Sequence, residues 1–310
     1  MSGVYVFGSN VSGDLDPSID LPILHDPHLL EYGRLGELQW HGWSCTIFQD
    51  EDDECEIWGI DALIPREERR GRRRLPRISK VIGVDRPLGF LDAEGWVHRQ
   101  AHGESGRRGE KAEGNEQPEV ERKKGEGFAK SIERFDEVRM TNDRVLSFRR
   151  HQGLSLSPRT PNSDPDFLSP LFLPDSVSSS LHHPLIDISK PLRIYSTESR
   201  FLIHTLGAAH HLLELSFPAP ACEPRWRMID DFEGVQITKI VTGAGDRFAL
   251  LTEVGDGWIL GPSSRGGAPE LVEIKGKEDG EVRDIGLGSG WEIVVLDGDV
   301  WVRGKSESIV

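Results

Sequence analysis

The residue types that could do chemistry in this chain are two pairs of adjacent histidines and three cysteines. The histidine pairs are His182-His183 and His210-His211. Neighbouring residues on a strand point to opposite faces, so each pair offers one imidazole per face, which disfavours a joint metal site. Cys45, Cys55 and Cys222 are too few and too scattered for a disulfide framework or a four-cysteine zinc site. We therefore expect no metal, no cofactor and a reducing compartment.

Two glycine-rich segments look like fragments of a nucleotide-binding loop. They are Gly243-Ala-Gly245 and Gly286-Leu-Gly-Ser-Gly290. Each leads into an apolar, strand-like run and not into a helix, so no helix N-terminus is available to hold a phosphate. We expect these glycines to serve turns and close packing between sheets. We find no recognisable set of catalytic residues in the sequence, so we expect that the protein is not an enzyme.

The same glycines belong to a repeated pattern. From Ile285 to Gly304 the sequence predicts a β-hairpin, with an apolar run, an Asp297-Gly298-Asp299 turn and a second strand around Trp301. Residues 240–261 have the same order of features, and Gly243 and Gly288 are 45 residues apart (288 − 243). A recurrence of this length is typical of propeller blades.

Weaker copies of the pattern occur elsewhere in the chain. We align residues 207–215 with 243–251, and we read residues 41–59, 81–97 and 137–148 as further copies. The chain opens with a lone strand at residues 4–8 that matches residues 300–304. We expect this strand to pair with the C-terminal hairpin and to close the ring of blades, which would remove free sheet edges.

These residues resemble the regulator-of-chromosome-condensation (RCC1-like) repeat family, chiefly over the first sixty and the last hundred residues. Blades of that family end in a Val-Tyr-x-Trp-Gly-like strand, and the strand before it is Gly-x-x-His-Thr-x-x-Leu-like. The family histidine is replaced here by Cys45, Leu212, Phe248 and Ile293. The opening ten residues are similar to the small fungal members known as α-tubulin suppressors or killer-toxin-insensitivity proteins.

The resemblance implies an all-β fold, a six- or seven-bladed β-propeller. With 310 residues, the chain fits one such body as a single domain, 1–310. We predict disordered insertions at 101–127, which is nearly devoid of apolar residues, and at 155–180, which is rich in Ser, Pro and Asp. A basic stretch at 66–76 reads as a solvated loop or as a nuclear-import or acidic-partner signal.

One position in each repeat is expected to fall on one rim of the propeller and to contact a partner. The predicted partner-binding residues are Trp43, Asp85, His210, Asp246 and Trp291. The alternative for the two tryptophans is packing between blades, which we also expect for Trp58, Trp96, Trp258 and Trp301.

The function that the resemblance implies is a non-enzymatic scaffold that binds another protein through one propeller face. The killer-toxin-insensitivity proteins suggest a zinc-ribbon protein of diphthamide synthesis and wobble-uridine tRNA modification as partner. The alternative is a guanine-nucleotide exchange factor for a Ran-like small GTPase. The net charge of −15 argues against direct nucleic-acid binding. We also expect no membrane span, a cytoplasmic or nuclear location and a monomer.

Overall fold

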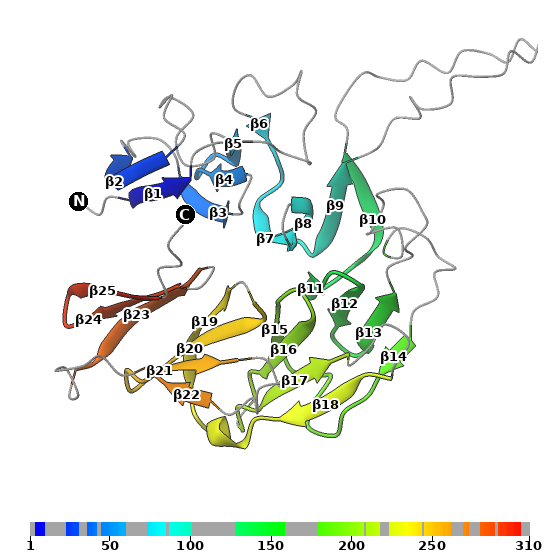
Figure 1. Cartoon of the computed structure of the whole chain (residues 1–310). Coiled ribbons are helices and arrows are strands. Elements are labelled where there is room, and N and C mark those ends of the chain that lie inside the picture. Colours follow the sequence, from blue (N-terminus) through cyan, green and yellow to red (C-terminus); the bar gives the residue numbers. More distant parts are fainter. Residues whose placement is uncertain are drawn as a thin grey trace, which may run out of the picture. The chain divides into compact units, whose positions relative to one another are not determined.

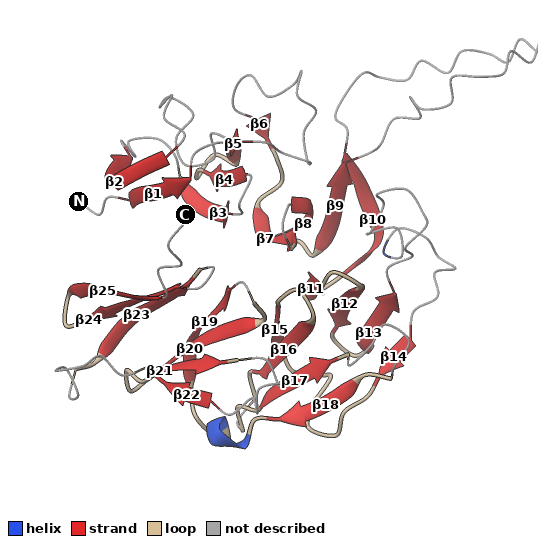
Figure 2. Cartoon of the chain, viewed as in Figure 1, coloured by secondary structure: helices blue, strands red, loops and turns tan. Residues whose placement is uncertain are grey.

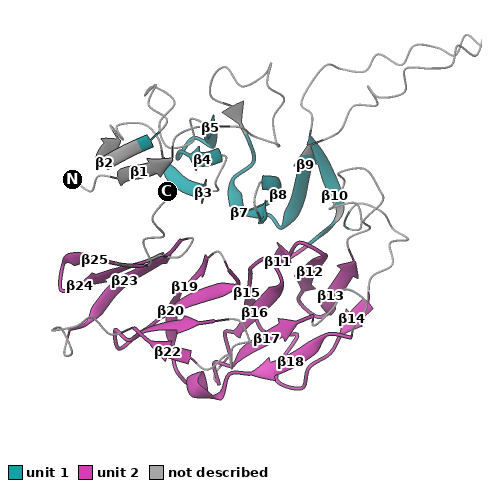
Figure 3. Ribbon diagram, viewed as in Figure 1, with its two compact units in different colours: residues 1–134, 171–174 teal, residues 135–170, 175–310 magenta. Residues whose placement is uncertain are grey.

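The computed structural model describes most of the chain. The described residues are 4–9, 23–30, 36–41, 45–59, 73–84, 87–100, 128–158, 171, 179–207, 209–217, 223–243, 245–261, 269–272, 280–288 and 291–304. Their regular secondary structure is antiparallel β-strand, joined by turns and loops, with one described 3-10 helix, η3 (Asp230–Phe232) (Figure 2). The chain divides into two compact units, residues 1–134 with 171–174 and residues 135–170 with 175–310 (Figure 3).

The first unit holds a two-stranded sheet and two four-stranded sheets, each built from strands that are consecutive in the chain (Figure 1). The two-stranded sheet is β1 (Val4–Ser9) and β2 (Ile23–Leu30). The next sheet is β3 (Glu37–His41), β4 (Cys45–Gln49), β5 (Glu54–Gly59) and β6 (Arg73–Arg74). The third is β7 (Ile78–Gly83), β8 (Pro87–Asp92), β9 (Trp96–Gln100) and β10 (Phe128–Arg134).

The second unit holds four more sheets with the same consecutive order (Figure 1). The first is β11 (Glu137–Met140), β12 (Arg144–Arg149), β13 (Gly153–Pro158) and β14 (Ser179–Leu181). The second is β15 (Leu192–Ser196), β16 (Arg200–Thr205), β17 (Leu212–Ser216) and β18 (Arg225–Met228). The third is β19 (Ile237–Gly243), β20 (Arg247–Thr252), β21 (Gly257–Leu260) and β22 (Pro269–Leu271). The last has three described strands, β23 (Val282–Leu287), β24 (Trp291–Leu296) and β25 (Asp299–Gly304).

The middle sheets of the second unit are buried on both faces. On β20, Phe248 and Leu250 pack in one apolar cluster, whereas Ala249 and Leu251 pack in the next. Alternate residues of a strand point to opposite faces. The sheet is therefore enclosed between its two neighbours, and the first strands of successive sheets, β11, β15, β19 and β23, contact one another in order. Apart from the two-stranded sheet of β1 and β2, the described strands form six consecutive antiparallel sheets, from β3–β6 to β23–β25, and these are the blades of a β-propeller.

The predicted C-terminal hairpin is confirmed. Val295 pairs with Val300 and Leu296 pairs with Asp299 across the turn. Asp297 and Gly298 have φ values of 51° and 90°. Two successive positive φ values at a two-residue loop are typical of the type I′ turn, which matches the twist of the flanking strands.

The predicted pairing of the opening strand with the C-terminal hairpin stays a prediction, because β1 and that hairpin belong to different compact units. β1 pairs with β2, with Val4 opposite Leu30 and Ser9 opposite Ile23, and the C-terminal sheet is β23-β24-β25.

The structure describes only a few residues of the two predicted insertions. Residues 101–127 lie outside the described residues, as do 159–170 and 172–178 of the second segment. Residues 155–158 belong to β13 and 179–180 to β14, so the two ends of that segment are strand. The extent of both insertions and the single-domain organisation stay predictions.

Candidate partner surface

The turns between the first and second strands of the sheets lie side by side at one end of the second unit. We call residues 141–143, 197–199 and 245–246 the turn row. Neighbouring turns are hydrogen-bonded to one another, beginning with the backbone N–H of Asn142, which donates to the carbonyl of Glu198 at 2.8 Å. Within the row, Asp143 and Glu198 are exposed. The row is therefore a fixed surface that carries acidic side chains.

Asp246 joins the second turn of the row to the third. One carboxylate oxygen accepts hydrogen bonds from the Thr197 hydroxyl at 2.7 Å and from the backbone N–H of Ser199 at 2.9 Å, and the other accepts from the Ser199 hydroxyl at 2.5 Å. Burial alone would raise the pKa of Asp246, but the hydrogen bonds from Ser199 and Thr197 and the charge of Arg200 outweigh it and lower that pKa. Asp246 is thus held ionised as a link between two blades.

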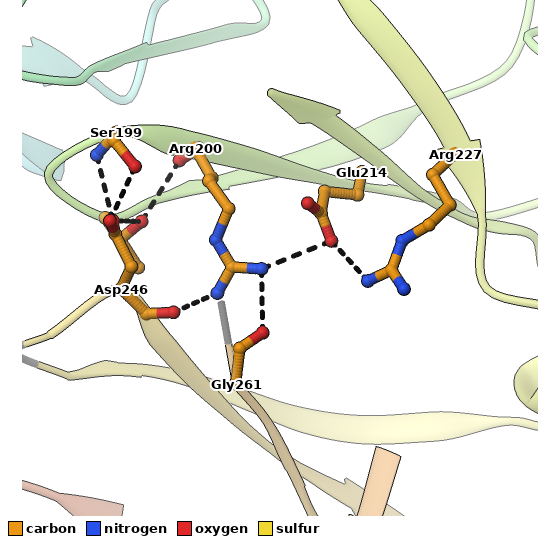
Figure 4. A network of polar contacts seen from close by, with 7 residues as sticks. Ser199, Arg200, Glu214, Arg227, Asp246 and Gly261 are labelled. Atoms are coloured by element: carbon orange, nitrogen blue, oxygen red, sulfur yellow. Dashed lines mark hydrogen bonds and ion pairs between the residues drawn. The ribbon is translucent and has the colours of Figure 1, made fainter. Parts of the chain in front are cut away.

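Arg200, the first residue of β16, lies beneath this link (Figure 4). Its guanidinium donates to the carbonyl oxygens of Asp246 and Gly261, the latter at 2.9 Å, and to Glu214 at 3.2 Å. Glu214 also accepts from Arg227 at 2.6 Å. The Arg200 and Glu214 side chains are only 4% and 2% exposed. A buried ion pair with this many partners fixes the relative position of two sheets.

Two other arginines, each at the start of the second strand of its sheet, also contact the sheet that follows. Arg247, at the start of β20, donates to Glu292 at 2.8 Å and to the carbonyl of Gly288 at 3.0 Å, both in the next sheet. Arg144, at the start of β12, lies 4.4 Å over the ring of Phe217 in the sheet that follows it. With Arg200, they form a series in which each arginine reaches from one blade into the next.

Only part of the predicted partner-binding set can be placed. Trp43 and Asp85 lie outside the described residues, and Trp291 is described only as the first residue of β24. Asp246 and His210 are both described, and both have positive φ, 57° and 38°. Partner binding by any of these five residues stays a prediction.

The alignment that placed His210 at the same repeat position as Asp246 is wrong. His210 follows β16 and precedes β17, the third strand of its sheet, whereas Asp246 precedes β20, the second strand of its own. Because consecutive strands run antiparallel, these two connections lie at opposite ends of the blades. Asp246 belongs to the turn row and His210 does not. The true counterpart of Asp246 in the blade of β16 is Ser199.

The arginine series is what the sequence reasoning missed. The signal was present as the Asp-Arg dipeptides Asp143-Arg144 and Asp246-Arg247, which precede equivalent strands. The acid is the predicted partner contact, whereas the arginine after it contacts the next blade. The third member, Ser199-Arg200, lacks the acid, and the alignment of residues 207–215 with 243–251 puts the wrong segment at its repeat position.

The predicted recurrence of tryptophans holds. Trp58, Trp96, Trp258 and Trp301 lie on β5, β9, β21 and β25, the third strands of their sheets. Trp58 packs edge-on against Phe48 at 4.9 Å and Trp258 against Phe232 at 5.6 Å. Trp301, on a sheet with three described strands, is 36% exposed.

The described residues contain no group of three or more His, Cys, Asp or Glu side chains arranged to hold a metal ion. In the same part of the chain, no helix is long and apolar enough to cross a membrane.

Comparison with known proteins gives a fold but no sequence family. No family model matches the chain, and no curated protein matches it. Human WBSCR16 is similar in structure, with a TM-score of 0.60 and 14% identity over 98% of this chain and 89% of that one. Prp20p from Saccharomyces cerevisiae has a TM-score of 0.60 and 14% identity, covering 97% and 80% of the two chains. Yeast RCC1 (Prp20) bound to Kap60 has a TM-score of 0.58 and 14% identity, covering 97% and 78%.

The chain therefore has an all-β, six-bladed β-propeller fold. The likeness is to an RCC1-like propeller, which agrees with the family resemblance seen in the repeats. At this level of identity, the likeness concerns the fold.

Proposed function

We propose that this chain is a non-enzymatic scaffold that binds a partner protein through the turn row. The observation that carries the proposal is the mutual fixing of the turns by Asp246 and Arg200 (Figure 4). A surface that is already ordered loses little conformational entropy on binding, so more of the contact energy appears as affinity. Propellers commonly present such an end of their blades to a partner, which supports this choice.

The charge of the turn row defines the kind of partner. Asp143 and Glu198 are exposed, and the chain carries a net charge of −15. A basic protein surface would be steered toward such a site, with an association rate that falls as salt screens the charges. Trp43 and Trp291 stay predicted aromatic contacts of the partner. His210, at the other end of its blade, would belong to a separate surface.

The finer identity of the partner rests on the family resemblance. A zinc-ribbon protein of diphthamide synthesis and tRNA wobble-uridine modification is the partner that the killer-toxin-insensitivity proteins suggest, with a cytoplasmic or nuclear location. Affinity purification of the chain followed by mass spectrometry tests this identity. Recovery of that zinc-ribbon protein or of tRNA-modification subunits supports it, and recovery of histones together with a GTPase contradicts it.

The second candidate function is guanine-nucleotide exchange on a Ran-like GTPase. It is favoured by the likeness to Prp20p, a structure described together with its binding to Gsp1p and histones. Release of a fluorescent guanine nucleotide from a panel of small GTPases separates the two functions. The scaffold proposal expects the spontaneous release rate, whereas acceleration at substoichiometric amounts of this chain would establish exchange activity.

A further inference from the structure

Two histidines face one another in the blade of β15 to β18, away from the turn row. His204 is the next-to-last residue of β16, and His210 lies in the connection from β16 to β17. Their ring centroids are 5.9 Å apart and the rings are tilted by 36°. The His204 side chain is almost fully buried, at 2% exposure.

Each ring has a buried nitrogen without a partner in the described residues. Nε2 of His204 and Nδ1 of His210 are both shielded from solvent and make no hydrogen bond there. Such atoms are rare in folded proteins, and each calls for an explanation such as a bound water or ion. Two of them on neighbouring rings point to one shared occupant.

A metal ion binds the free electron pair of a neutral imidazole nitrogen. Nε2 of His204 and Nδ1 of His210 are the ring nitrogens that lack a hydrogen bond in the described residues, so they are the atoms available to an ion.

The backbone holds the second ring in place. His210 has a positive φ of 38°, and its N–H donates to the carbonyl of Gly207 at 3.3 Å. The next N–H, of His211, donates to the Thr205 hydroxyl at 2.9 Å. Gly234, after η3, donates to the carbonyl of Ala209 at 3.3 Å. The connection is therefore fixed at several points and presents His210 in a defined position.

We propose that His204 and His210 bind one borderline-soft divalent transition ion such as Zn²⁺ or Cu²⁺. An ion about 2.1 Å from one nitrogen of each ring would keep the two centroids at most about 6.4 Å apart, which the observed 5.9 Å satisfies. Imidazole nitrogens suit zinc, copper and nickel, and not magnesium or calcium. The described residues supply no third protein ligand, so the remaining positions are open to water or to a group from outside.

The other histidine pair provides a natural control. His183 packs against Trp226 at 4.9 Å, and burial followed by the nearby His211 lowers the pKa of His183. His210 and His211 therefore have different histidine neighbours. His182 is exposed. Removing the His182 ring changes the number of histidines without touching the proposed site.

The test uses the full chain with Zn²⁺ in calorimetry and Cu²⁺ in electron paramagnetic resonance. The wild type and His182→Ala should bind one ion, with a Cu²⁺ signal split by two nitrogens. His210→Ala should weaken Zn²⁺ binding at least tenfold, and the splitting should fall to one nitrogen, with circular dichroism unchanged. His204→Gln should do the same, provided that its circular dichroism is unchanged.

Two results overturn the proposal. If His210→Ala binds Zn²⁺ as tightly as the wild type, the ion lies elsewhere. If the wild type binds neither ion at micromolar concentrations, the two nitrogens face water only.

Discussion

Arg247 donates a hydrogen bond of 2.8 Å to Glu292, a residue 45 positions further along the chain and one blade away. This separation equals the interval between Gly243 and Gly288 in the repeat. Lys239 and Asp284, also 45 residues apart, form an ion pair between the first strands of the same two sheets. The sequence repeat is thus visible as contacts between equivalent parts of successive blades.

Replacing Arg200 with Met should destabilise the chain strongly. Glu214 would stay buried and lose one of its ion-pair partners while keeping Arg227, and two carbonyl oxygens would lose a donor. Breaking a buried pair by removing one partner typically costs about 3–5 kcal/mol, and Arg227 should keep the loss near 3 kcal/mol. Urea unfolding of the variant and the wild type measures this difference.

The matched control is Arg150→Met. Arg150 pairs with Asp136 at 2.7 Å, but the two side chains are 55% and 30% exposed. An exposed ion pair contributes about 0–1 kcal/mol. If both arginine variants lost the same stability, the special role of Arg200 between the blades would be refuted.

Acid should weaken the link that Asp246 makes. Its pKa is lower in the folded chain than the ordinary value of 3.8. A lowered folded pKa contributes stability that is present above the unfolded pKa and is lost as the pH falls through the folded one. We expect Asp246→Asn to reduce stability at pH 7 and to flatten the fall in the unfolding midpoint below about pH 4. Thermal unfolding between pH 7 and pH 2.5 checks this; curves that stay parallel for the two proteins would argue against the link.

Gly243 should resist substitution because of close packing between blades. A Cβ atom at this position would lie 2.5 Å from Cβ of Leu287 on β23. Overpacking of this kind costs about 1–3 kcal/mol, so Gly243→Ala should lower the unfolding midpoint by several degrees. Gly286→Ala is the control, since its nearest neighbour would be an ordinary contact at 3.9 Å. Equal melting temperatures for the two variants would contradict this packing.

The thiol of Cys55 should be inert in the folded chain. Burial, followed by the charges of Asp50 and Asp53, raises its pKa to about 12. Only the thiolate reacts with iodoacetamide, so we expect no labelling of Cys55 at pH 8 until the chain is unfolded. Mass spectrometry of the labelled peptides in buffer and in 6 M guanidinium, roughly enough to unfold most domains, provides the measurement. Rapid labelling in buffer would show that this sheet opens.

The sequence predicted the all-β propeller class and the C-terminal hairpin because both depend on local patterns. The Asp297-Gly298 turn and the alternating strands around it determine the hairpin without help from distant residues. Features that depend on residues far apart in the sequence were not predicted. The repeat position of His210 is mispredicted because Gly207 resembles Gly243, the last residue of β19.

The most direct test of the scaffold proposal is the affinity of the purified chain for the partner recovered with it, measured by calorimetry at 50 and 200 mM salt. Asp143→Lys/Glu198→Lys reverses the exposed charges of the turn row. The control, Glu253→Lys/Asp256→Lys, makes the same change in the exposed turn after β20, at the opposite end of its blade. We predict at least a tenfold loss of affinity for the first variant, with weaker salt dependence, and wild-type binding for the second. Unchanged binding by the turn-row variant, or an equal loss in both, would contradict the proposal that the turn row is the partner surface.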